Sequence, residues 1–129
     1  MDGDAQYLQI GQVSDRTELS LKTIRHYDEV GLVQPSARSA GGFRLYTAAD
    51  VERLLTIRRM KPLGFTLAEM KRLLDAIDVI DDSTASARLR AAASAELRDF
   101  RAKARDSAEQ LRRQLAYAQE FAELLDRLA

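Results

Sequence analysis

The feature that most constrains this sequence is a stretch of 43 residues, 86–128, that contains neither glycine nor proline. It is dominated by Ala, Leu, Arg, Glu and Gln, which are strong helix formers. The stretch therefore predicts one continuous helix, roughly 60 Å long at about 1.5 Å per residue. Because the remaining residues make a head of only about 75 residues, one domain of modest size, we expect a partner to cover part of this helix.

Apolar residues recur along the predicted helix with the seven-residue period of a coiled coil. We call ten positions the heptad seam: Leu97, Ala104, Leu111, Ala118 and Leu125, and, three residues after each, Phe100, Ser107, Gln114, Phe121 and Leu128. The seam is apolar at both ends. We therefore predict a two-stranded coiled coil between two copies of the chain, with dimer contacts from Leu97, Phe100, Ala104, Leu111, Ala118, Phe121 and Leu125.

Two short helical segments are expected near the start of the chain, at residues 10–14 and 19–30, with a break around "DRTELS". Ser20 can accept a hydrogen bond from the free N–H groups of a helix that begins at Leu21. Gly31 can end that helix in the left-handed conformation. The spacing predicts a helix-turn-helix.

On the second of these helices the polar residues share one face. Steps of about 100° place Lys22, Arg25, His26 and Glu29 together, and Leu21, Ile24 and Tyr27 around the other side. The polar face could enter a nucleic-acid groove while Ile24 holds the helix on its neighbour. Two structural alternatives stay open, a half-buried Tyr27 with its hydroxyl at the surface and a pair between Glu29 and Arg25.

A hairpin and two further helices follow. "FRLYT" alternates after a Ser/Ala/Arg/Gly stretch and predicts a β-hairpin, a wing. Thr47 and Asp50 have capping-box spacing and open a helix that ends near Met60. After "KPLGF", Thr66 and Glu69 repeat the spacing, so a fourth helix begins at Leu67 and fades around "DVIDDSTAS".

Charge and composition narrow the possible functions. Residues 16–72 hold eleven Lys and Arg against six Asp and Glu, whereas residues 76–129 hold nine against ten. The chain has no cysteine and one histidine, which argues against disulfides, thiolate metal sites and His-rich metal sites.

No catalytic constellation is recognisable, so we expect no enzyme and no cofactor. No secretory or membrane-spanning segment is visible, which predicts a cytoplasmic protein.

The order "IGQVSDRT", "TIRHYDEVGLVQP" and "GGFRLYTAADVERLLTIRRMKPLGFTLAEMKRLL" resembles the DNA-binding half of the MerR family of bacterial transcription regulators. The resemblance implies a mainly α fold, with a winged helix-turn-helix domain at residues 1–75, a linker at 76–85 and a dimerisation helix at 86–129 in an antiparallel coiled coil. It further implies a homodimer on a palindromic promoter operator. Such a dimer would distort the DNA so that RNA polymerase can engage both promoter elements.

The resemblance also assigns candidate contacts with DNA. Lys22, Thr23 and His26 are candidates for base edges or nearby phosphates, and Arg25 and Tyr27 for phosphates. In the wing the candidates are Arg44 and Tyr46, and beside a second, helical wing they are Arg58, Arg59 and Lys61. Tyr46 has a packing alternative, and the basic residues of the third helix could be a solvated face.

Several alternatives remain open at this point. Metal- and oxidant-sensing members of the family use cysteines, which this sequence lacks, and it ends at Ala129 without the added ligand-binding domain of drug-sensing members. The signal could be a small organic effector, a protein partner or nothing. The resemblance favours activation, and a repressor or a constitutive architectural DNA binder is the alternative. A coiled-coil adaptor that binds protein is the competitor from another class.

Overall fold

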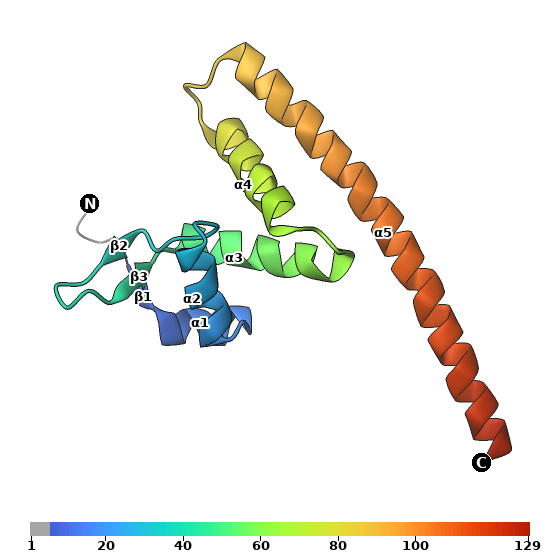
Figure 1. The fold of residues 1–129 in the computed structure, drawn as a ribbon. Helices are drawn as coiled ribbons and strands as arrows, with labels where there is room; N and C mark the ends of the chain where they lie inside the picture. The colour runs from blue at the N-terminus through green and yellow to red at the C-terminus, as the bar shows by residue number, and fades with distance from the viewer. Residues whose placement is uncertain (1–5) are drawn as a thin grey trace. The chain divides into compact units, whose positions relative to one another are not determined.

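The computed structural model describes residues 6–129, which divide into two compact units at Leu74 and Asp75. The first unit begins with strand β1 (Leu8–Gln9) and contains the remaining short elements in chain order (Figure 1). These are α1 (Ile10–Thr17), α2 (Leu21–Glu29), β2 (Ala37–Arg38), β3 (Arg44–Tyr46), α3 (Ala48–Met60) and the 3-10 turn η2 (Lys61–Leu63). Helix α4 (Leu67–Asp81) crosses the boundary, and α5 (Ala87–Leu128) belongs to the second unit. The predicted mainly α fold with a winged helix-turn-helix is confirmed.

The helix-turn-helix consists of α1 and α2, and its second helix begins where the sequence predicts. Ser20 is the N-cap, and its Oγ accepts a hydrogen bond from the Thr23 backbone N–H at 3.0 Å. Gly31, just past the end of α2, has a φ of 74°, in the left-handed region. The first helix is longer than the predicted 10–14 and ends at Thr17. The connection is therefore only three residues long.

The predicted wing is present, and it includes a strand that the pattern did not predict. The sheet order is β1-β3-β2, with both pairs antiparallel. Arg38 pairs with Arg44 across the hairpin, and Leu8 pairs with Tyr46 on the other edge of β3. Strand β1 leads directly into α1, so the sheet and the helix-turn-helix form one continuous structure.

Both predicted capping boxes are formed. Thr47 Oγ1 accepts from the Asp50 backbone N–H at 3.1 Å, and Asp50 Oδ2 accepts from the Thr47 backbone N–H at 2.9 Å. At the start of α4, Thr66 Oγ1 accepts from the Glu69 backbone N–H at 3.1 Å, and Glu69 Oε1 accepts from the Thr66 backbone N–H at 3.0 Å. These boxes satisfy N–H groups that would otherwise have no helical partner, which fixes both helix starts.

The core of the first unit is contributed by its helices together with β3. The fully buried side chains there include Val13 from α1, Ile24 from α2, Tyr46 from β3 and Leu54 and Ile57 from α3. Burying one aliphatic side chain of this size stabilises a fold by roughly 1.5–3 kcal/mol. The buried side of α2 is thus fixed by Ile24, and its opposite side is left for other contacts.

The second unit is dominated by α5, a helix of 42 residues whose N-cap is Ser86 (Figure 1). Ser86 Oγ accepts from the Leu89 backbone N–H at 3.2 Å, and Arg90 Nη1 donates to the Ile80 carbonyl oxygen at 3.2 Å, at the end of α4. No helix within residues 6–129 is long and apolar enough to cross a membrane.

Burial along α5 changes sharply with position. Phe100 is 6% exposed, and Leu97 and Ala104 are partly buried in the single chain. From residue 108 to the end every residue is exposed, including Leu111, Ala118, Phe121 and Leu125 of the heptad seam. Of the seven predicted dimer contacts, Phe100 is therefore already covered within its own chain, which leaves the C-terminal half of the seam as the uncovered part.

Candidate nucleic-acid interface

The turn between α1 and α2 is fixed by side chains, and this sets the direction of α2. Thr17 Oγ1 donates to the Val13 carbonyl oxygen at 2.8 Å and accepts from the Leu19 N–H at 3.2 Å, while Ser14 Oγ donates to the Leu19 carbonyl oxygen at 2.6 Å. Arg58 of α3 donates from Nη1 to the Thr17 carbonyl oxygen at 2.7 Å. Arg58, a predicted contact with the DNA backbone, is exposed and makes this hydrogen bond at the C-terminal end of α1.

The outward side of α2 presents basic groups. Lys22, Arg25 and His26 are exposed, as the helical spacing predicts. Neither Lys22 nor Arg25 forms an ion pair or side-chain hydrogen bond with another residue of the range 6–129, so the possible pair between Arg25 and Glu29 is not formed. Two uncompensated cations on one exposed helical face form a surface suited to a polyanion.

Two other candidates of the α2 segment also have structural contacts. Thr23 is partly buried, and its Oγ1 accepts from the Ser20 hydroxyl at 2.9 Å beside the N-cap. Tyr27 is 4% exposed, and burial raises the pKa of its phenol. Its ring lies 6.2 Å from the His26 ring, centroid to centroid. The packing alternative for Tyr27 thus agrees with its position.

Tyr46 requires a correction. It is 0% exposed, and its hydroxyl is buried without a hydrogen-bond partner among the described residues. Burial of the phenol raises its pKa. A hydroxyl in this position does not reach the surface, so the expected phosphate contact is replaced by the packing alternative. Strand alternation indicates two faces but not which of them points inward.

A buried carboxylate joins the wing to α2. Asp28 Oδ2 accepts from Arg44 Nε at 2.6 Å and from Arg38 Nη2 at 2.9 Å, and the Asp28 side chain is 7% exposed. The hydrogen bond to Asp28 raises the pKa of the Arg44 guanidinium. Arg44, a predicted phosphate contact, joins the hairpin to α2 through this bond. Asp28 is the functional residue that sequence reasoning missed, since nothing in the local pattern pairs it with residues 10 and 16 positions away.

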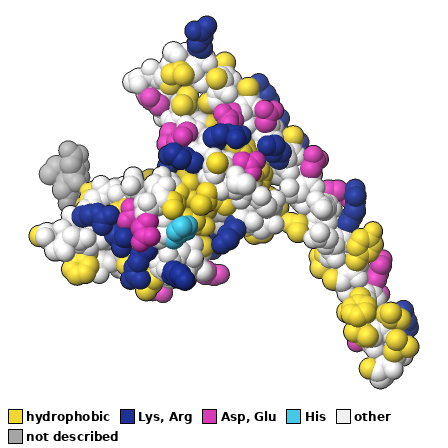
Figure 2. Space-filling model, viewed as in Figure 1, with side chains coloured by type: hydrophobic (Ala, Val, Ile, Leu, Met, Phe, Trp, Pro, Cys, Tyr) yellow, Lys and Arg dark blue, Asp and Glu magenta, His cyan; other side chains and the backbone are white. Residues whose placement is uncertain are grey.

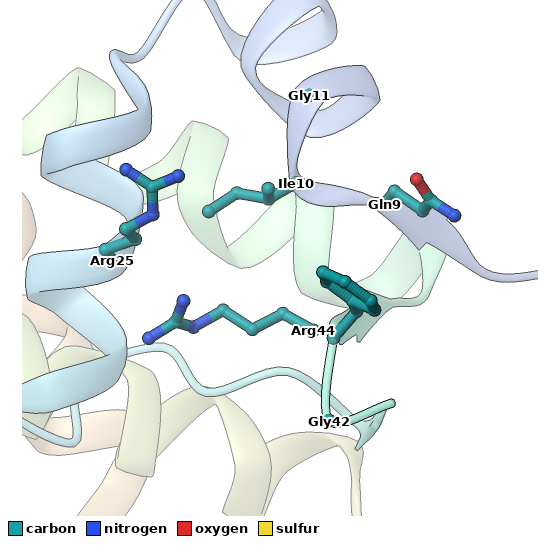
Figure 3. A pocket seen from close by; sticks show the side chains of 7 residues that line it. Gln9, Ile10, Gly11, Arg25, Gly42 and Arg44 are labelled. Atoms are coloured by element: carbon teal, nitrogen blue, oxygen red, sulfur yellow. The ribbon is translucent and has the colours of Figure 1, made fainter. Parts of the chain in front are cut away.

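A pocket of about 290 Å³ opens where α2, the start of α1 and the wing meet. In Figure 3, Arg25 from α2, Ile10 from the start of α1 and Arg44 from β3 surround the same space. The complete lining is Gln9, Ile10, Gly11, Arg25, Gly42, Phe43 and Arg44. The pocket brings together two of the predicted site residues, Arg25 and Arg44, and it is large enough for a phosphate group.

The two remaining candidates, Arg59 and Lys61, lie at the C-terminal end of α3 and just after it. Arg59 and Lys61 are exposed, and neither of them lines this pocket. Figure 2 shows Lys and Arg side chains gathered over the wing and α2, interrupted by a few acidic groups. The basic excess of residues 16–72 is thus partly a surface property. A helix-turn-helix with a free basic face and an attached wing defines the class: a winged helix-turn-helix DNA-binding protein.

Comparison with known proteins identifies the family. Residues 8–77 match the family described as MerR HTH family regulatory protein, and residues 51–128 match the family described as MerR, DNA binding. Each match covers more than half of the chain. The chain therefore belongs to the MerR family and is a DNA-binding transcriptional regulator, not an enzyme.

Individual relatives agree with this assignment. The transcriptional regulator HmrR of Rhizobium leguminosarum is 38% identical over 110 residues, which cover 85% of this chain and 82% of HmrR. The transcriptional activator mta of Bacillus subtilis is 45% identical over 67 residues, but these span only 26% of mta. Among solved structures, the N-terminal part of the Bacillus subtilis multidrug transporter activator superposes with a TM-score of 0.54 at 30% identity, covering 93% of this chain and 95% of that one.

Proposed function

We propose that this regulator acts as a homodimer that binds a palindromic promoter operator in the cytoplasm and distorts it to activate transcription by RNA polymerase. The observation that carries the proposal is the exposed, uncompensated basic face of α2, with Lys22, Arg25 and His26 on a helix whose direction is fixed by the preceding turn. A helix of this kind fits the major groove, and its N-terminal residues reach base edges.

The candidate residues take different roles in this proposal. Lys22, Thr23 and His26 contact base edges or nearby phosphates, because they lie at the start and in the middle of the α2 face that enters the groove. Arg25 binds a phosphate from the edge of the pocket, and Arg59 and Lys61 add contacts with the backbone. Arg44 acts indirectly, since its bond to Asp28 fixes the wing against α2.

The homodimer is supported by the uncovered part of the heptad seam. Leu111, Phe121 and Leu125 are 40%, 61% and 47% exposed in the single chain. Figure 2 shows apolar side chains gathered at the end of α5. A second copy in the antiparallel orientation would cover this apolar surface, which a soluble monomer rarely exposes to such an extent. The two-fold axis of such a dimer would match a palindromic operator.

Activation through distortion is favoured over repression by the name of one relative, the Bacillus subtilis activator mta, whose N-terminal part is also the solved structure compared above. Bending a site of 20–30 base pairs costs on the order of 1–6 kcal/mol, which several charge-assisted phosphate contacts from each subunit can offset. The signal that triggers the distortion would be a small organic effector or a protein partner.

The first test is fluorescence anisotropy with a labelled duplex from upstream of the protein's own coding region, titrated against salt and against a scrambled duplex. We expect binding to the native fragment that scrambling abolishes, with an affinity that falls steeply as salt rises because neutralised phosphates release counterions. An affinity that does not change with salt concentration would contradict the proposal. If both duplexes bind equally, selection from a randomised pool should return a palindrome, and a pool without one would contradict the palindromic operator.

The direction of regulation needs a second assay. Transcription with purified RNA polymerase from the bound promoter should rise when the protein is added with its effector. A fall in transcript would instead support a repressor, and binding without any change would support a constitutive architectural protein. Sedimentation of the full chain should give the mass of two copies.

A further inference from the structure

Phe43, at the tip of the wing, is an exposed aromatic residue beside a basic pocket. It is 71% exposed, whereas the next most exposed large hydrophobic residues of the first unit, Val30 and Tyr7, are 46% and 45% exposed. Phe43 lines the pocket together with Arg25 and Arg44. An aromatic ring exposed to this extent contributes little to the core, so its face is available to contact a ligand of the adjoining pocket.

The wing turn holds Phe43 firmly. The Ser39 N–H donates to the Phe43 carbonyl oxygen at 2.9 Å, and the Phe43 N–H donates to Ser39 Oγ at 3.1 Å. Gly42 has a φ of 83°, which glycine tolerates best. A Cβ placed on Gly41 would lie 3.1 Å from Cε2 of the Phe43 ring. The ring therefore lies close to a backbone position that has no side chain, and hydrogen bonds fix the backbone that carries it.

We propose that Phe43 is a DNA-contacting residue that packs its ring against a deoxyribose of the backbone segment whose phosphate is bound at Arg25. The inference rests on the proposed function and adds an apolar contact to an interface otherwise made of charges. A deoxyribose presents C–H groups next to each phosphate, so a sugar and its phosphate can meet a ring and a guanidinium on two sides of one pocket.

The surroundings favour DNA over an apolar protein surface as the occupant. Arg25 has no acidic partner among residues 6–129 and lines the same pocket, so an apolar protein partner would bury an unpaired cation. A nucleic-acid backbone supplies both the anion and the apolar sugar. Apolar side chains inserted beside basic ones are a known means of contact for DNA-binding proteins.

The test compares the salt dependence of duplex binding for three variants, with a random 30-base-pair duplex as the probe so that no operator is needed. Phe43→Ala should weaken binding about fivefold at every salt concentration and leave the salt slope unchanged, because the lost contact is apolar. Arg25→Ala should instead reduce the slope by about one. Val30→Ala, which truncates an exposed apolar residue outside the pocket, is the matched control and should bind like the wild type.

A double-mutant cycle examines the support under the ring. Gly41→Ala should weaken binding by displacing the ring, and it should add nothing once Phe43 is alanine. Because the chain has no tryptophan, Phe43→Trp provides a single emission probe, whose acrylamide quenching should fall when the duplex binds. Circular dichroism melting confirms that each variant is folded.

Three results would overturn the inference. Wild-type affinity for Phe43→Ala, with the wild type itself binding in a salt-dependent manner, rejects the contact but leaves the proposed function intact. A reduced slope for Phe43→Ala means that the ring acts through the charges and not as an apolar contact. Failure of the wild type to bind any duplex at low salt rejects the proposed function, and the inference falls with it.

Discussion

The two units of this chain bury their apolar residues in opposite ways. In the first unit Ile24, Leu54 and Ile57 are completely buried within one chain. In the second unit, the C-terminal part of the heptad seam is exposed, with Phe121 at 61% and Leu125 at 47%. The contrast teaches that the first unit completes its core within one chain, whereas the end of α5 has an apolar face without its complement. Stability of the first unit and assembly through the second should therefore respond to different substitutions.

The largest expected effect is on assembly. Replacing both Leu111 and Leu125 by glutamate puts unpaired carboxylates into the proposed seam, so dimerisation should weaken at least a thousandfold, or by about 4 kcal/mol. Sedimentation equilibrium measures the change. The matched control, Ala116→Glu with Gln119→Glu, adds the same charge outside the seam and should remain dimeric. A double glutamate variant that still sediments as a dimer would reject the seam.

A smaller effect is expected from the core of the first unit. Leu54→Ala leaves a cavity at a position that is 0% exposed, so the free energy of unfolding should fall by about 3 kcal/mol. Chemical denaturation measures it. In the monomeric double glutamate variant, truncation of the exposed Leu124 on α5 should change the value by less than about 0.5 kcal/mol. Similar losses at both positions would contradict the contrast between the units.

The Asp28 carboxylate should contribute less than the core but more than a surface charge. Asp28→Asn removes the anion shared by Arg38 and Arg44, so the free energy of unfolding should fall by about 2 kcal/mol. DNA binding should weaken as well, because the wing is no longer held against α2. Asp15→Asn, at an exposed carboxylate of α1, is the control and should have stability close to wild type. Equal melting of the two variants would show that the shared anion does not stabilise the wing.

The smallest effect concerns the connection between α1 and α2. Glu18 has a φ of 60°, the left-handed conformation that a residue with a Cβ adopts at a disadvantage. Glu18→Gly should raise the free energy of unfolding by about 0.5 kcal/mol, since relief of the strain exceeds the added entropy of the unfolded chain. Glu18→Ala retains the strain and should not stabilise the protein. Thermal denaturation of both variants distinguishes the effect of backbone conformation from the effect of removing the Glu18 charge.

The parts of the fold that could be predicted from sequence are those with local signals. Ser20, Thr47 and Thr66 precede helices because each side chain accepts from a backbone N–H three residues later, and all three positions are predicted from the sequence. Strand β1 escaped prediction because two residues carry no periodicity and the strand exists only through its pairing with β3. The extension of α1 to Thr17 depends in part on a hydrogen bond from Arg58, which is 41 residues away.

The candidate site also contains some residues whose position local sequence signals predict and others whose position they do not. The exposure of Lys22, Arg25 and His26 follows from a helical period of 3.6, so the sequence was sufficient to predict it. The burial of Tyr46 and the engagement of Arg44 by Asp28 depend on which face of the hairpin turns inward. Tertiary packing decides that orientation, and a short alternating strand does not reveal it. Phe43 and Tyr46 are both aromatic residues of the wing, yet one is exposed and the other is buried.

The exposed end of α5 also bears on how long a newly made chain survives in the cell. Before the proposed homodimer forms, each chain would present Arg112 and Arg113 beside an uncovered apolar surface, which proteases and chaperones can engage. Assembly would cover that surface and lengthen the lifetime of the protein. Cells that make little of the regulator would then lose it faster than mass action alone predicts, so its abundance would depend steeply on its rate of synthesis.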